Sequence, residues 1–284
     1  QNVACPGFPG RAFLASGDAV LGLMVEVFRN IITALRSLLA YMSVSLWVIL
    51  LAPPGMCLAV LFDWPQVLYW LGRGGVRLGL GTVGITYRVV GQEHIQQDRA
   101  AVYCVNHSSN IEPPILYMSL ATIHPRLRIL YKSEIHKIPV LSRAFDIVGF
   151  VPIARQNRER SMRAIDKAAE ALRDGNSFLI FPEGTRSRTG ELQRFKKGGF
   201  IMAIEGRAAI VPVAIQGTQA AMRKGSPIIR PVTVSIRFGS PIELSDVGMA
   251  DRNKLIELTS KSVKSLLDQG PVTDLEILSA NKKR

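Results

Sequence analysis

The sequence is poor in cysteine and lacks the motifs of several large enzyme classes. Its 284 residues include three cysteines, Cys5, Cys57 and Cys104, which are too few and too far apart for a disulfide framework or a zinc set. It has no Walker phosphate loop, no Gly-x-Ser-x-Gly nucleophile elbow and no dinucleotide-binding fingerprint. These absences favour a reducing compartment and leave a reaction that proceeds without a protein nucleophile.

Acidic residues are scarce relative to basic ones. There are 22 Asp and Glu residues against 35 Lys and Arg residues, which gives a formal net charge of +13. Such a chain attracts polyanions, whether nucleic acid, acidic cofactors or the negative surface of a bilayer. No recognition helix, aromatic platform or zinc-finger spacing supports nucleic-acid binding. We therefore expect this basic chain to bind an anionic membrane surface and not nucleic acid.

One long stretch contains no charged residue at all. It covers residues 37–62, between Arg36 and Asp63, and is long enough to cross a bilayer with tilt. Pro53-Pro54-Gly55 interrupts it, and paired prolines disfavour a continuous helix. The sequence thus predicts an apolar helical hairpin that turns at these prolines and anchors the chain in one leaflet, with residues 12–35 as a further interfacial helix. The alternative is a buried core hairpin of a soluble protein.

After residue 82 the pattern changes to short β-rich runs that alternate with helical stretches. This alternation predicts an α/β fold with a largely parallel central sheet flanked by helices. We therefore divide the chain into a membrane-associating helical segment at residues 1–82 and an α/β domain at residues 83–284. The expected strands are 83–90, 101–105, 127–131, 178–181, 210–215 and 232–238, and the expected helices are 115–123, 140–145, 159–173, 198–205 and 254–267.

Two polar residues follow the apolar run at residues 101–105, and open α/β sheets bind ligands beyond the carboxyl ends of their strands. His107 offers a general base, and Glu112 offers a carboxylate that can orient it. A separation of five does not place two side chains on one helix face, so the intervening residues must turn. Such a turn brings the carboxylate to the imidazole Nδ1 and leaves Nε2 facing outward. The alternative without a catalytic role is a loop whose His and Glu are solvated or cap the next helix.

The segment Glu183-Gly184-Thr185-Arg186 follows a second apolar run and should line the same sheet edge. Gly184 permits close backbone approach, Thr185 supplies a hydroxyl, and Arg186 carries a forked cation that suits phosphate oxygens. A general base beside an anion-binding loop is typical of a transferase that acts on a phosphorylated alcohol. Lys132 and Arg155 end other short β runs and are further candidates, although each alone is typical of an exposed surface cation.

Four blocks in this order resemble the 1-acyl-sn-glycerol-3-phosphate acyltransferase family. They are Asn106 to Glu112, Gly149 to Arg155, Phe181 to Ser187 and Val211 to Ile215, within a match that runs from about Val83 to Phe238. The apolar hairpin before them is similar to that family's membrane anchor. One position departs from the family pattern: its first block ends in Asp, whereas Glu112 places the carboxylate on an extra methylene.

The resemblance implies transfer of a fatty acyl group from a thioester, acyl-CoA or acyl carrier protein, to the free hydroxyl of lysophosphatidic acid. His107 would take the hydroxyl proton, Glu112 would fix the imidazole tautomer, and Arg186 would hold the acceptor's phosphate. No metal or tightly bound cofactor is needed, because the acyl thioester is a co-substrate. The implied catalytic residues are His107 and Glu112, and the implied substrate-binding residues are Lys132, Arg155, Glu183, Gly184, Thr185 and Arg186.

Two other functions stay open at this point. The same chemistry could serve another lysophospholipid or glycerol-3-phosphate, although the basic residues near Arg186 favour a phosphomonoester. Alternatively, the chain could be a membrane-surface lipid-binding protein without catalysis. In each case we expect it to be membrane-associated, and the enzymatic reading places it on the cytoplasmic face.

Overall fold

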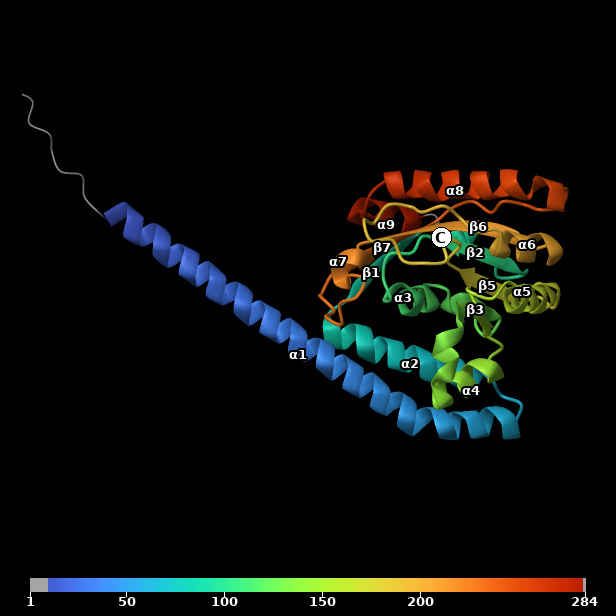
Figure 1. Cartoon of the computed structure of the whole chain (residues 1–284), viewed down its shortest axis with the longest axis horizontal. Coiled ribbons are helices and arrows are strands. Elements are labelled where there is room, and N and C mark those ends of the chain that lie inside the picture. Colours follow the sequence, from blue (N-terminus) through green and yellow to red (C-terminus); the bar gives the residue numbers. More distant parts are fainter. Residues whose placement is uncertain (1–9, 283–284) are drawn as a thin grey trace, which may run out of the picture.

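The computed structural model describes residues 10–282, and a long N-terminal helix extends well beyond the rest of the molecule (Figure 1). This helix, α1 (Gly10–Leu61), is followed by a turn at Asp63 and by α2 (Gln66–Val83), which runs back along α1. Of the described helices, α1 alone is long and apolar enough to cross a membrane, over Val20–Leu61. Most of its apolar side chains in this stretch are exposed, as a lipid-facing helix requires.

The expected turn at Pro53-Pro54 is wrong, because α1 continues through both prolines and the hairpin turns about ten residues later. Packing against α2 explains the difference. Gly74 and Gly75 leave room for the Trp47 ring, since a Cβ on Gly74 would lie 2.5 Å from it. Trp47 also donates its indole N–H to the Leu71 carbonyl at 3.0 Å. These tertiary contacts hold the helix although two backbone donors are missing.

A seven-stranded sheet follows, in the order β1-β7-β6-β2-β5-β3-β4. Every pairing is parallel except that of β6 with β7. The predicted α/β class with a largely parallel sheet is therefore confirmed. The strands are β1 (Thr86–Val90), β2 (Ala101–Val105), β3 (Leu127–Lys132), β4 (Val151–Ile153), β5 (Ser177–Ile180), β6 (Ala209–Gln216) and β7 (Thr233–Phe238).

Helices cover both faces of the sheet (Figure 1). Tyr103 of β2 packs into the core on the side of α2 and α3, whereas its neighbours Val102 and Cys104 pack on the side of α5, α6 and α8. This alternation follows from the twofold period of a strand, and burial on both sides explains why β2 is apolar throughout. The helices are α3 (Glu112–Ser119), α4 (Pro139–Ile147), α5 (Arg158–Arg173), α6 (Gly198–Glu205), α7 (Thr218–Ala221), α8 (Arg252–Asp268) and α9 (Asp274–Lys282).

Candidate active site

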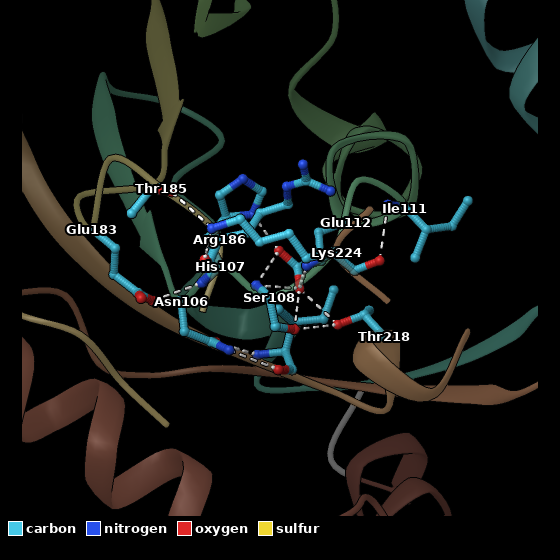
Figure 2. A network of polar contacts seen from close by, with 12 residues as sticks. Asn106, His107, Ser108, Ile111, Glu112, Glu183, Thr185, Arg186, Thr218 and Lys224 are labelled. Carbon is cyan, nitrogen blue, oxygen red and sulfur yellow. Dashed lines mark hydrogen bonds and ion pairs between the residues drawn. The ribbon is translucent and has the colours of Figure 1, made fainter. Parts of the chain in front are cut away.

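The candidate site lies at the carboxyl ends of three neighbouring strands, β2, β5 and β6 (Figure 2). Direct hydrogen bonds join the loops that leave β2 and β5. The backbone N–H of Ser187 donates to the His107 carbonyl at 2.7 Å, and the His107 N–H donates to Glu183 Oε1 at 2.7 Å. The two loops that the sequence singled out separately are therefore one structural unit.

His107 and Glu112 form a hydrogen-bonded pair. Glu112 Oε2 lies 2.6 Å from the imidazole Nδ1, and the Glu112 side chain is fully buried. Glu112 is the first residue of α3, where Pro113 and Pro114 follow in the first turn. Its position favours a negative charge, because the N-terminus of a helix carries a partial positive charge. The geometry that the five-residue spacing predicted is thus present in the structure.

The second oxygen of Glu112 accepts hydrogen bonds from two surrounding loops. Glu112 Oε1 accepts hydrogen bonds from the Ser108 N–H at 2.9 Å, the Ser108 hydroxyl at 2.8 Å, the Ser109 N–H at 2.9 Å and the Thr218 hydroxyl at 2.6 Å. A buried carboxylate is costly unless such donors satisfy it. The network therefore fixes the Glu112 side chain in the orientation that meets the imidazole.

The imidazole of His107 has a defined orientation. Its ring stacks on Phe181, with ring centroids 4.2 Å apart and an interplanar angle of 30°. Because Nδ1 faces Glu112, Nε2 is the ring nitrogen left to meet a substrate. The side chain of His107 is about one-tenth exposed, so a small part of the ring meets solvent.

Glu183 is buried, and its carboxylate binds the backbone of His107. It is 3% exposed, and its two oxygens accept the N–H groups of His107 and Gln193, at 2.7 and 3.2 Å. Burial raises the pKa of Glu183 to about 7, although the two backbone donors oppose this effect. Glu183 is therefore a titratable group in direct contact with the backbone of the candidate base.

Arg186 extends from the same loop and lies beside His107 in the close view (Figure 2). Lys224, from the segment after α7, holds this part of the loop in place. Its ammonium group donates to the Arg186 carbonyl at 2.8 Å and to the Thr185 hydroxyl at 3.3 Å. The structure thus brings the imidazole, the guanidinium and a further cation to one region of the surface.

Gly184 has a left-handed backbone conformation that favours glycine. Its φ is +72°, and an added Cβ would lie 2.8 Å from the side chain of Lys196. Arg155 reaches the same loop, since its guanidinium donates to the Gly184 carbonyl. Lys132, in contrast, is exposed at the end of β3, pairs with Glu134 at 2.9 Å, and shares no hydrogen bond with these residues within the described chain.

Several residues of the site were not identified from the sequence. Asn106 joins the ends of β2 and β6, because its amide donates to the Ile215 carbonyl at 2.9 Å and accepts from the Ile215 N–H at 2.8 Å. Ser108, Ser109 and Thr218 satisfy Glu112. Thr218 follows β6 directly, so the rule that strand ends carry the site could have indicated it. No sequence signal indicates Lys224.

An apolar cavity of about 310 Å³ lies between α1, α2, α3 and α4. Pro113 and Pro114, which follow Glu112 directly, form part of its wall, together with Tyr117 of α3. Trp47 of α1 and Phe145 of α4 line other parts of it. The cavity therefore joins the helices next to the candidate base with the helix that could enter a membrane.

Comparisons with known proteins show which family this chain resembles. A family model described as Acyltransferase matches residues 86–216. The chain is 32% identical over 199 residues to the 1-acyl-sn-glycerol-3-phosphate acyltransferase of Limnanthes douglasii, with 68% of each chain covered. It is 27% identical to the protein of the same description from Borreliella burgdorferi, over 72% of this chain and 78% of that one.

The fold has also been seen in a solved structure. The crystal structure of the 1-acyl-sn-glycerophosphate (LPA) acyltransferase from Thermotoga maritima superposes with a TM-score of 0.72 and 22% sequence identity. The likeness covers 86% of this chain and 100% of that one. The residues that the family model matches include His107, Glu112 and Arg186, whereas Thr218 and Lys224 lie beyond them.

Proposed function

Because the chain belongs to the family of 1-acyl-sn-glycerol-3-phosphate acyltransferases, we propose that it transfers a fatty acyl group from an acyl thioester to lysophosphatidic acid, giving phosphatidic acid. The observation that carries this proposal is the buried Glu112 carboxylate 2.6 Å from His107 Nδ1, beside a loop that bears Arg186. A carboxylate on Nδ1 fixes the tautomer in which Nε2 is free to accept a proton.

The transfer needs one base that later acts as an acid. Nε2 of His107 takes the proton of the acceptor hydroxyl as its oxygen attacks the thioester carbonyl. The tetrahedral intermediate then collapses, the carbon–sulfur bond breaks, and the imidazolium returns the proton to the leaving thiolate. Glu112 stabilises the imidazolium in between. No bond forms between the protein and the acyl group, and the reaction needs no metal or tightly bound cofactor.

Binding of the acceptor's phosphate positions its hydroxyl for the reaction. Arg186 can grip phosphate oxygens in bidentate fashion, and Arg155 reaches the same loop through the Gly184 carbonyl. Lys132 adds a more distant cation at the end of β3. Gly184 and Thr185 shape the wall of this pocket, and Glu183 holds it against His107. These groups favour a phosphomonoester over a lysolipid with a choline headgroup.

The apolar parts of the structure suit a substrate that resides in a bilayer. Helix α1 exposes apolar side chains along Val20–Leu61, and the cavity between α1, α2, α3 and α4 has room for hydrocarbon. A net charge of +13 favours an anionic leaflet, with about 1 kcal/mol per cation near the surface. These features support our proposal that the protein is membrane-associated, on the cytoplasmic face.

The test is an assay of the purified protein in phospholipid vesicles. Labelled acyl thioester is offered with lysophosphatidic acid, lysophosphatidylcholine or glycerol-3-phosphate in parallel. We expect phosphatidic acid as the main product, and we expect His107→Ala to abolish its formation while vesicle binding stays intact. Preference for the choline lipid would contradict phosphate recognition, and transfer by the His107→Ala variant would contradict the proposed base.

A further inference from the structure

A loop at residues 222–231, here called the bridging loop, runs from α7 toward α1 (Figure 1). At its beginning it is bound to both loops that form the candidate site. The Ser109 hydroxyl, in the turn before α3, donates to the Met222 carbonyl at 2.8 Å. The ammonium group of Lys224 donates to the Arg186 carbonyl at 2.8 Å (Figure 2). The bridging loop therefore contacts the part of the site that we assign to the acceptor's phosphate.

The other end of the bridging loop is bound to α1. The Ser37 hydroxyl accepts the Ile229 N–H at 2.9 Å, and its own proton faces the carbonyls of Thr33 and Ile229, at 2.7 and 3.2 Å. One helical turn later, the Tyr41 hydroxyl donates to the Pro227 carbonyl at 2.8 Å. Ser37 is 2% exposed, and hydrogen bonds away from water are stronger. Two side chains on one face of α1 therefore hold this end of the loop.

The hydroxyl groups of α1 differ in what they bind. Ser43 donates to the Ala40 carbonyl of its own helix at 3.2 Å, as hydroxyl groups in helices commonly do. Ser37 and Tyr41, in contrast, bind backbone groups 192 and 186 positions away. Among the described residues of α1, Trp47 is the other side chain with a hydrogen bond outside this helix, and its partner is on α2. The hydrogen bonds that described side chains of α1 make to the α/β domain therefore all go to the bridging loop.

The bridging loop is closed by hydrogen bonds of its own backbone. Lys224 lies inside a turn in which the Ser226 N–H donates to the Arg223 carbonyl at 3.1 Å. This turn ends one residue before the first contact with α1. The Arg230 N–H donates to the Ala221 carbonyl at 2.7 Å, so the two ends of the loop are joined. Because the loop is short and closed in this way, we expect a displacement of its α1 end to move the turn that carries Lys224.

We propose that Ser37 and Tyr41 are positioning residues for the acceptor, which act through the bridging loop. By holding the turn around Lys224, they keep this cation on the Arg186 carbonyl and so fix the loop whose guanidinium binds the phosphate. This inference rests on the proposed function. Because α1 is also the helix that we propose enters the membrane, the position of a bilayer-bound helix then sets the affinity for an acceptor that resides in the bilayer.

Steady-state kinetics of the full-length protein in phospholipid vesicles test the proposal. For the double variant Ser37→Ala/Tyr41→Phe we expect KM for lysophosphatidic acid to rise about three- to tenfold, with kcat changed less than about twofold and KM for the acyl thioester unchanged. Ser43→Ala is the matched control, since it removes a hydroxyl from α1 that binds within the helix, and it should change none of these values. Loss of folded protein alone would lower kcat and leave both KM values as they are.

A double-mutant cycle tests the route through Lys224. In a Lys224→Met background the contact between the bridging loop and the Arg186 carbonyl is already lost. The Ser37→Ala/Tyr41→Phe changes should then raise KM for lysophosphatidic acid by less than about twofold further, because effects that share one contact are not additive. Effects that multiply in full would show that α1 acts by another route, which would overturn the proposal.

Amide hydrogen exchange without substrate separates this inference from the proposed function. We expect residues 183–188 and 222–231 to exchange faster in the double variant than in wild type or Ser43→Ala. If they do, although no lysophosphatidic acid is acylated by the wild type, the coupling of α1 to the Arg186 loop stands and the proposed reaction fails. Unchanged exchange at residues 183–188, or an unchanged KM for lysophosphatidic acid in an active double variant, overturns the positioning role.

Tyr41→Phe alone keeps the test available if the double variant does not fold. Tyr41 is 41% exposed, and the change removes a single oxygen atom without opening a cavity. We expect its KM for lysophosphatidic acid to rise about twofold or more, with the thioester KM unchanged. A wild-type KM in this variant, together with wild-type exchange at residues 222–231, would contradict the proposal.

Discussion

Glu112 reaches Nδ1 of His107 at 2.6 Å from the first position of a helix, across a turn of only four residues. The family pattern described above has aspartate here, which is shorter by one carbon–carbon bond. In this chain the longer side chain is accommodated because its other oxygen is fixed by donors on Ser108, Ser109 and Thr218. The backbone conformation around His107 therefore fits the length of a glutamate side chain at position 112.

This relationship predicts that the family's own residue fails at this position. In Glu112→Asp the carboxylate withdraws by about 1.5 Å, which breaks the contact with Nδ1. We expect kcat to fall by more than about tenfold, and Glu112→Gln, which keeps the shape but removes the charge, to lose about 10²- to 10⁴-fold. Initial rates at saturating substrates measure both. Wild-type activity in the aspartate variant would show that the turn adapts freely.

Glu183 should make stability depend on pH in a defined direction. Burial raises its pKa from 4.5 to about 7 in the folded protein. Between these values the folded state binds more protons than the unfolded state, so the free energy of unfolding falls as pH rises. For Glu183→Gln we expect this fall to be smaller, by about 1.4 kcal/mol per pH unit. Denaturant unfolding between pH 5 and pH 7 measures the slope.

The slope, rather than the absolute stability, is the informative quantity for Glu183. The glutamine amide also loses the acceptor for the Gln193 N–H, which is a cost that does not vary with pH. Glu191→Gln is the control, since Glu191 is exposed in the same loop and should keep the wild-type slope. If Glu183→Gln also keeps that slope, then Glu183 is ionised in the folded protein throughout this range.

Lys224 should affect binding of the acceptor more than the chemical step. Its ammonium group holds the Arg186 carbonyl and the Thr185 hydroxyl, so Lys224→Met loosens the loop that carries the guanidinium. We expect KM for lysophosphatidic acid to rise about three- to tenfold, with kcat changed less than about twofold. Arg223→Met, which removes the exposed neighbouring cation, is the control. Equal effects of the two variants would indicate a general effect of charge.

Asn106 should contribute to stability through its two bonds to Ile215. Asn106→Asp keeps the size but replaces the donor with an oxygen that faces the Ile215 carbonyl. We expect the free energy of unfolding to fall by about 2–4 kcal/mol, because a buried acceptor is left unsatisfied beside another. Asn110→Asp, at an exposed position in the same loop, should change it by less than about 0.5 kcal/mol. Equal stability of the two variants would contradict this role.

Local sequence was sufficient for six of the seven strands and for the central pair of the site. The apolar runs at 101–105 and 178–181 predicted β2 and β5, because strands buried on both faces must be apolar throughout. His107 and Glu112 were identified because they follow such a run within one turn. The separate prediction of an anion-binding loop at Arg186 depended on the same rule, that ligands meet strand ends.

The sequence alone indicated most strands and helices of the α/β domain, their order and the residue types at the strand ends, because these follow from hydrophobic period and local chain geometry. Only the tertiary structure decided which loops contact each other. Packing of α2 against Trp47 carried α1 through Pro53-Pro54, and the neighbouring positions of β2 and β6 brought Thr218 to Glu112 across 106 positions of sequence. Such contacts depend on where distant segments pack, and no local pattern encodes that arrangement.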